Sequence, residues 1–118
     1  MTNSEIAGIL RQIGDMMDIL GENRFKVIAY RRAADNVQNL GTDIRTYWQA
    51  GTLQEVPGVG QAIADKIDEL LSTGHLEFYE RLQDQVPVGV VSLLEIPDVG
   101  PKTAKLLWDE LGLQSVAE

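Results

Sequence analysis

The sequence predicts an all-α fold, a compact helical domain that carries two helix-hairpin-helix motifs. Apolar residues recur at intervals of three and four along most of the chain, which is the period of an amphipathic helix. No long run alternates apolar and polar residues, so signals for β-strands are nearly absent. The chain has 118 residues, 44% of them hydrophobic, which is enough for a small helical core.

The first half of the chain predicts three helices. Ser4 can cap the first of them and Gly21 can end it. The apolar residues that recur along this helix are Ile6, Ile9, Leu10, Ile13, Met16, Met17 and Leu20. A second helix is predicted over about residues 24–40, and a short third helix begins at the capping residue Thr42.

An internal repeat organises the second half. A shift of 40 residues aligns segment 53–72 with segment 93–112, and seven of the twenty positions are identical. The residues repeated are Leu53, Glu55, Pro57, Val59, Gly60, Ala64 and Leu71. Each segment predicts a short helix, a tight turn and a longer helix, so one motif is expected over 53–74 and another over 93–112. A helix over about residues 75–85 follows the first motif.

The two turns, Pro57-Gly58-Val59-Gly60 and Pro97-Asp98-Val99-Gly100, have a composition suited to phosphate binding. Proline ends the first helix, and glycine permits a positive φ and a close backbone approach. The next helix then begins with unpaired N–H groups, which attract anions together with the helix dipole. Val59 and Val99 are expected to pack inward. Such contacts reach the DNA backbone, so they predict DNA binding without sequence specificity.

The second motif differs from the first in its charge. Asp98 stands where the first motif has a glycine, and a carboxylate repels phosphate. Lys102 and Lys105 flank this turn and are its expected DNA contacts, together with Gly100. For both motifs, an ordinary αα-hairpin with a glycine turn is the alternative without a DNA-binding role.

The net charge of −8 restricts where DNA can bind, because nucleic-acid binders usually present a basic surface. Residues 1–23 carry a net charge of −3 and residues 67–118 carry −7, whereas residues 24–66 carry +2. The phosphate-facing surface is therefore expected in the middle third, with weak and salt-sensitive binding. The acidic balance also leaves open a protein-interaction domain that uses its hairpins only for packing.

Two sequence runs carry a resemblance to a known family. They are Ile-Ala-Tyr-Arg-Arg-Ala-Ala at 28–34 and Val-Pro-Gly-Val-Gly-Gln-Ala-Ile-Ala-Asp-Lys-Ile at 56–67. With them, the chain resembles the N-terminal region of family X DNA polymerases over essentially its whole length. It is more similar to the bacterial members than to the animal repair enzyme, polymerase beta. The resemblance implies a polymerase-beta-like N-terminal fold and DNA binding at gaps or 5′-phosphate ends in repair synthesis.

The resemblance also implies two parts. Residues 1–85 match the small helical domain that binds the 5′ phosphate at a DNA gap, which is the lyase domain in polymerase beta. Residues 86–118 match the start of the polymerase region, whose hairpin holds the primer-side strand. The nucleotidyl-transfer carboxylates of the family, and the Mg²⁺ they bind, lie further along, so the chain is expected to be a fragment without polymerase activity.

The residues of the lyase pocket carry over unevenly. Lys66 matches the family's Schiff-base lysine, Lys26 a phosphate-binding lysine and Tyr30 a pocket tyrosine. The animal enzyme has a histidine or a lysine at four positions that are uncharged here: Phe25, Gln54, Ala62 and Phe78. The DNA-contacting residues expected in this part are Lys26, Tyr30, Arg31, Gly58, Val59, Gly60 and Ala62.

Family members also hold a monovalent cation at each hairpin through backbone carbonyl groups. The resemblance therefore implies a K⁺ or Na⁺ ion at each of the two turns. The carbonyl groups would be those of Gln54, Val56 and Val59 in the first motif, and of Leu94, Ile96 and Val99 in the second.

Lys66 has two possible roles. As a 5′-deoxyribose phosphate lyase, its neutral amine attacks the sugar aldehyde, and the imine that forms makes elimination possible. Ile63 and Ile67 can bury its stem, but lysine amines are mostly protonated at neutral pH. In the second role the lysine stays a cation and contacts phosphate. DNA binding is therefore the predicted function, with lyase activity as an alternative.

Several other classes of site are disfavoured. The absence of cysteine excludes disulfides and thiolate metal sites, and His75, the single histidine, has no clustered partner for a metal. No apolar run approaches the roughly 20 residues that span a bilayer, and the N-terminus lacks the basic start of a signal peptide. A monomeric, cytoplasmic protein is expected.

Overall fold

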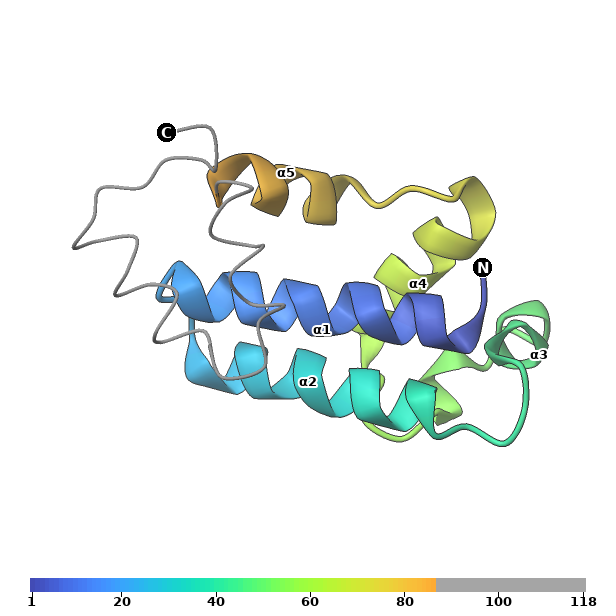
Figure 1. The fold of residues 1–118 in the computed structure, drawn as a ribbon. Coiled ribbons are helices and arrows are strands. Elements are labelled where there is room, and N and C mark those ends of the chain that lie inside the picture. The colour runs from blue at the N-terminus through green and yellow to red at the C-terminus, as the bar shows by residue number, and fades with distance from the viewer. Residues whose placement is uncertain (87–118) are drawn as a thin grey trace.

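The computed structural model describes residues 1–86, and within that range the regular structure is entirely helical, as the sequence predicts. The elements, labelled in Figure 1, are α1 (Asn3–Ile19), α2 (Arg24–Gln38), α3 (Ile44–Gln49), the 3-10 helix η1 (Leu53–Glu55), α4 (Gln61–Thr73) and α5 (Glu77–Gln85). The second motif (93–112) lies outside the described residues, with the sites predicted there: Leu94, Ile96, Val99, Gly100, Lys102 and Lys105.

The N-cap of α1 lies two residues earlier than predicted. The Thr2 hydroxyl accepts the backbone N–H of Glu5 at 3.1 Å, so Thr2 is the cap rather than Ser4. Thr2 and Glu5 have the spacing of a capping box, whereas Ala7 stands at the matching position after Ser4. The Ser4 hydroxyl instead accepts a hydrogen bond from the Gln38 amide at 3.0 Å, which ties the start of α1 to the end of α2.

α2 and α3 are capped by an amide and by a carboxylate side chain. The Asn23 side chain accepts the N–H of Phe25 at 2.8 Å at the start of α2. α3 begins after Asp43, whose carboxylate accepts the N–H of Arg45 at 2.9 Å, and not after the predicted Thr42. Aspartate caps a helix at least as well as threonine, so the stronger cap one residue later sets the start.

α1 and α2 form an antiparallel pair that supplies most of the core (Figure 1). The fully buried residues of this pair include Ile6, Leu10, Ile13, Met16, Val27, Ala33, Ala34 and Val37. The helices pack tightly at Gly14, where a Cβ would lie 3.2 Å from Cγ of Arg31 and 3.4 Å from the Val27 carbonyl oxygen. The pair is the platform on which the rest of the chain packs.

The hairpin follows η1 and leads directly into α4. Val56 and Val59 are buried, which confirms the inward packing predicted for Val59. The N–H of Val59 donates to the Val56 carbonyl at 3.0 Å and closes the turn. Gly58 has φ +80°, a conformation that L side chains rarely adopt, and Gly60 is the N-cap of α4. α4 ends at Gly74, which has φ +79°.

α5 packs against α1, and its Phe78 ring reaches Tyr30 of α2 (Figure 1). Leu76, Leu82 and Val86 bury its inner face, and the Tyr79 hydroxyl donates to the side chain of Gln12. Among residues 1–86, no helix combines the length and the apolar character needed to cross a membrane.

Candidate functional site

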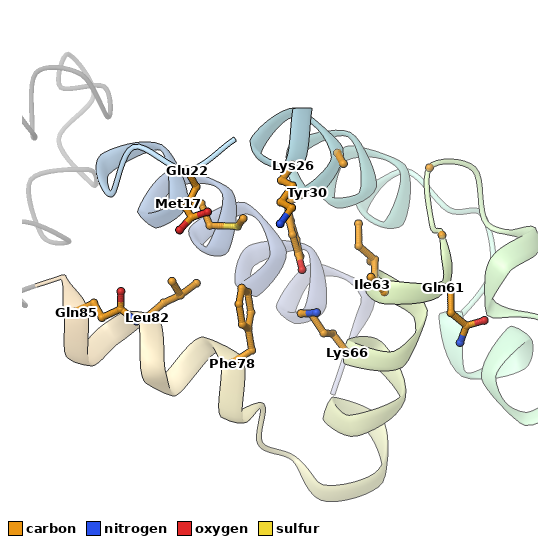
Figure 2. A pocket seen from close by; sticks show the side chains of 14 residues that line it. Met17, Glu22, Lys26, Tyr30, Gln61, Ile63, Lys66, Phe78, Leu82 and Gln85 are labelled. Carbon is orange, nitrogen blue, oxygen red and sulfur yellow. The ribbon is translucent and has the colours of Figure 1, made fainter. Parts of the chain in front are cut away.

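A pocket of about 550 Å³ opens between α2, the hairpin turn, α4 and α5 (Figure 2). The hairpin residues Gly58 and Gly60 line it, together with the side chains of Lys26, Tyr30 and Lys66. The sequence predicts DNA contacts at Lys26, Tyr30, Gly58 and Gly60, and for Lys66 either a Schiff base or a phosphate contact. The structure brings them around a single cavity, although they come from three separate segments of the chain.

A lysine and two aromatic rings form the inner wall of this pocket. The Lys66 ammonium lies 4.7 Å from the centre of the Phe78 ring and 6.0 Å from that of Tyr30. The two rings are stacked, with centroids 6.3 Å apart and planes inclined by 17°. Figure 2 shows the Tyr30 hydroxyl pointing toward Lys66. The cation–π contacts attract the charged form of the lysine and hold its head group at the wall of the cavity.

Tyr30 keeps its proton over the whole physiological pH range. The side chain is 6% exposed, and burial raises the pKa of its hydroxyl to about 12. Burial has this effect because the phenolate ion loses hydration that the neutral phenol needs far less. The hydroxyl can therefore donate a hydrogen bond to an anion in the pocket at neutral pH.

The wall of the pocket carries few charged side chains. Ala62 and Phe78 line it without charge, and Gln54 lines a different pocket on the other side of α4. Glu22 adds a carboxylate to the pocket wall. Phe25 on α2 is 83% exposed and is not among the residues that line the pocket. The two lysines are thus the positive charges of the pocket wall, and one carboxylate opposes them.

Ion pairing removes Arg31 from the group of available cations. Its guanidinium contacts Asp15 at 2.9 Å and Asp18 at 3.1 Å on α1, and Arg24 contacts Asp18 at 3.6 Å. The DNA contact predicted for Arg31 would have to compete with these two carboxylates. Within residues 1–86, the basic side chains without an ion pair are Lys26, Arg32, Arg45 and Lys66.

Two residues of α2 that the sequence did not single out lie against the hairpin turn. The Asn36 amide donates to the Pro57 carbonyl at 2.8 Å. A Cβ built on Gly58 would lie 2.8 Å from the Asn36 amide nitrogen and 3.4 Å from Cγ of Arg32. Their spacing of four residues places them on one face of α2, but no local pattern links that face to a turn 21 residues later.

The three carbonyl groups predicted to bind a cation belong to η1 and the turn. The Val56 carbonyl accepts the Val59 N–H, which leaves it a second lone pair. Gln54 precedes Pro57 by three residues, and proline has no N–H to occupy the Gln54 carbonyl. Neutral oxygens of this kind fit a monovalent cation, and ion binding at this turn stays a prediction. No cluster of acidic or histidine side chains suited to a metal occurs in residues 1–86.

The chain is similar to known DNA polymerases. It is 33% identical over 113 residues to the DNA polymerase/3′-5′ exonuclease PolX of Bacillus subtilis (strain 168), covering 96% of this chain and 19% of that protein. It is 31% identical over 109 residues to DNA polymerase lambda of Arabidopsis thaliana, covering 92% and 20%. DNA polymerase lambda of Rattus norvegicus is 27% identical over 116 residues, covering 98% and 19%. The chain spans about a fifth of the length of these curated relatives.

The family match agrees with the fold and with the hairpin geometry. Residues 1–76, which include η1, the turn and α4, match the helix-hairpin-helix domain. The resemblance to the N-terminal region of family X DNA polymerases is confirmed by the relatives above. The chain belongs to the helix-hairpin-helix domain family.

Proposed function

We propose that this chain binds the 5′-phosphate end of a gap in duplex DNA, as the N-terminal part of a longer family X DNA polymerase that acts in repair synthesis. The observation that carries the proposal is the pocket in which Lys66, Lys26 and Tyr30 meet the hairpin glycines. We further propose that the chain acts as a monomer. We also propose a cytoplasmic location, as expected for a bacterial polymerase.

A terminal phosphate fits the groups that the pocket presents. The dianion has three oxygens, which can pair with the Lys66 ammonium and accept a hydrogen bond from the Tyr30 hydroxyl. α4 begins at the same pocket, so the N–H groups of its first turn, at the positive end of the helix dipole, lie there. Lys26, exposed on α2, adds a second charge from the opposite wall. None of these contacts reads a base, so binding is independent of DNA sequence.

The preference for a gap has separate support in Phe25. Its ring is 83% exposed, which is unusual for a large apolar side chain on a small protein. A gap leaves template bases without partners, and aromatic side chains stack on unpaired bases with little regard to their identity. Phe25 directly precedes Lys26, so it would meet a base next to the bound phosphate end.

Affinity measurements on two matched DNA substrates test the proposal. Fluorescence anisotropy of gapped duplexes with a 5′ phosphate or a 5′ hydroxyl compares the wild-type chain, Lys66→Ala and Arg45→Ala. We expect Lys66→Ala to weaken binding to the phosphate-bearing DNA about tenfold, the loss of one charged contact, and to change binding to the hydroxyl form little. Arg45→Ala removes an unpaired charge of α3, outside the pocket, and is the control. Equal affinity of the wild type for both substrates would contradict the phosphate site.

Lyase activity is the second candidate, supported by the position of Lys66 at the wall of a cavity that is large enough for a sugar phosphate. The amine would form an imine with the sugar C1′ and release water, and loss of the C2′ proton would then expel the 3′ phosphate. Borohydride reduction on incised abasic DNA traps that imine as a covalent adduct. An adduct in the wild type that is missing in Lys66→Ala supports lyase activity, and no adduct in either chain excludes it.

A further inference from the structure

We infer that α2 supplies the hairpin with its own phosphate contact, through Arg32, and holds the turn in place through Asn36. The inference rests on the proposed DNA-binding function and assigns two residues outside the 5′-phosphate pocket to it. It concerns the internal phosphates of the DNA strand that passes over the turn. Contact with them does not depend on whether that strand ends in a 5′ phosphate or a 5′ hydroxyl.

The turn rests directly on α2. The Asn36 amide donates to the Pro57 carbonyl at 2.8 Å, between residues that are 21 apart in the sequence. Gly58 lies so close to this face that a Cβ would come within 2.8 Å of the Asn36 nitrogen, 3.4 Å of Arg32 Cγ and 3.7 Å of Ala33 Cα. The contacts come from one turn of α2, so the position of the hairpin depends on this helix and not only on η1 and α4.

Arg32 brings an uncompensated positive charge to the turn. Its side chain is exposed, and it makes no ion pair within residues 1–86. The nearest acidic residue along α2, Asp35, is held by Arg11 of α1 at 3.0 Å. An exposed arginine whose stem lies beside a glycine turn can reach a phosphate there, and the phosphate can accept two of its N–H groups at once.

The backbone of the turn offers donors next to that charge. In the part of the chain that the structure describes, the N–H groups of Gly58 and Gly60 donate to no other protein group, whereas the N–H of Val59 closes the turn. A phosphate that pairs with Arg32 therefore finds hydrogen-bond donors on the same surface. Asn36 is uncharged and does not contact the phosphate itself. It acts as a positioning residue, because its hydrogen bond to the Pro57 carbonyl fixes the direction in which the N–H groups of the turn point.

Salt titrations of DNA binding separate the two roles. The substrate is a gapped duplex that ends in a 5′ hydroxyl, so the Lys66 pocket contributes little. We expect Arg32→Ala to weaken binding about tenfold and to reduce the slope of log affinity against log salt by about one, the loss of one phosphate contact. We expect Asn36→Ala to weaken binding without a change of slope and to shift the amide resonances of Gly58 and Gly60 in the free protein. Arg45→Ala, which removes an unpaired exposed charge from α3, should change neither property.

The outcomes distinguish this inference from the proposed function. Wild-type slope and affinity in Arg32→Ala, or a loss no larger than that of Arg45→Ala, would overturn the Arg32 contact while DNA binding by the wild type stands. Unchanged affinity and glycine resonances in Asn36→Ala would overturn its positioning role. If the wild-type chain binds gapped DNA with neither a 5′ phosphate nor a 5′ hydroxyl, the proposed function and this inference are overturned together. Circular dichroism of each variant checks that the helices are intact.

Discussion

At the scale of single residues, ion pairing decides which basic side chains can reach DNA. Four arginines of residues 1–86 are held by carboxylates of the chain itself: Arg11, Arg24, Arg31 and Arg81. Three of the four remaining cations, Lys26, Arg32 and Lys66, surround the hairpin and its pocket. A protein with an acidic net charge can therefore present a local cationic surface without any excess of basic residues.

The conformation of Gly58 gives a stability prediction. Gly58→Ala places a Cβ on a residue with φ +80°, at 2.8 Å from the Asn36 nitrogen, so we expect a loss of about 1–3 kcal/mol in the free energy of unfolding. Gly8→Ala lies within α1 with no atom near its Cβ, and we expect a gain of about 0.5–1 kcal/mol. Urea unfolding of both variants checks this contrast. A stabilising Gly58→Ala would show that the turn does not require glycine.

Tyr30 gives a prediction at alkaline pH. Its pKa is about 12 in the folded chain, whereas a free phenol ionises near pH ~10. Between these values the unfolded chain has lost the proton that the folded chain keeps, so the free energy of unfolding falls as pH rises, by up to about 3 kcal/mol. This contribution is constant below pH ~10. Urea unfolding across this window should show a shallower decline in Tyr30→Phe, and equal declines would contradict the burial effect.

At the scale of elements, the start of α1 depends on its Thr2 cap. Thr2→Ala removes the acceptor of the Glu5 N–H, so we expect it to lower the free energy of unfolding by about 1 kcal/mol. Ser4→Ala removes only the exposed hydrogen bond with Gln38 and should cost less. Thermal unfolding of the two variants ranks them. A larger effect of Ser4→Ala would restore Ser4 as the cap that the sequence predicted.

The helices themselves could be predicted from the sequence because their signals are local. Periodicity located α1 and α2, and the repeat located the turn between η1 and α4 with its buried Val59. α5 was also expected, over about residues 75–85. The caps were misplaced by one or two residues because Ser4 and Thr42 are also good caps, and the choice depends on which side chain meets a free N–H.

The candidate site was predictable in part. The resemblance assigned Lys26, Tyr30 and Lys66 to one pocket, where the structure places them. The pairing of Arg31 with two carboxylates of α1 and the contact of α2 with the hairpin were not predictable. Both depend on how α2 packs between α1 and the turn, and periodicity reports only that a face is buried, not what covers it.

At the scale of the whole molecule, the parts of the described chain combine into one binding surface. The α1–α2 pair carries most of the core, and the hairpin rests on α2. α5 lines the pocket opposite α2 (Figure 2). The acidic residues lie mainly outside this surface or are paired with arginines. Because the group of unpaired cations is so small, we expect the isolated chain to bind DNA weakly and in a salt-dependent way.

The most direct test of the central claim is a chemical-shift titration of the isotope-labelled chain with a gapped duplex that carries a 5′ phosphate. The account predicts the largest changes at Gly58, Gly60, Lys66 and Tyr30, which line one pocket. It also predicts that a 5′ hydroxyl in place of the phosphate removes the changes at Lys66 and Tyr30 while those at the glycines persist. Changes confined to α3, or no changes with either DNA, would contradict a phosphate site between α2, the hairpin and α5.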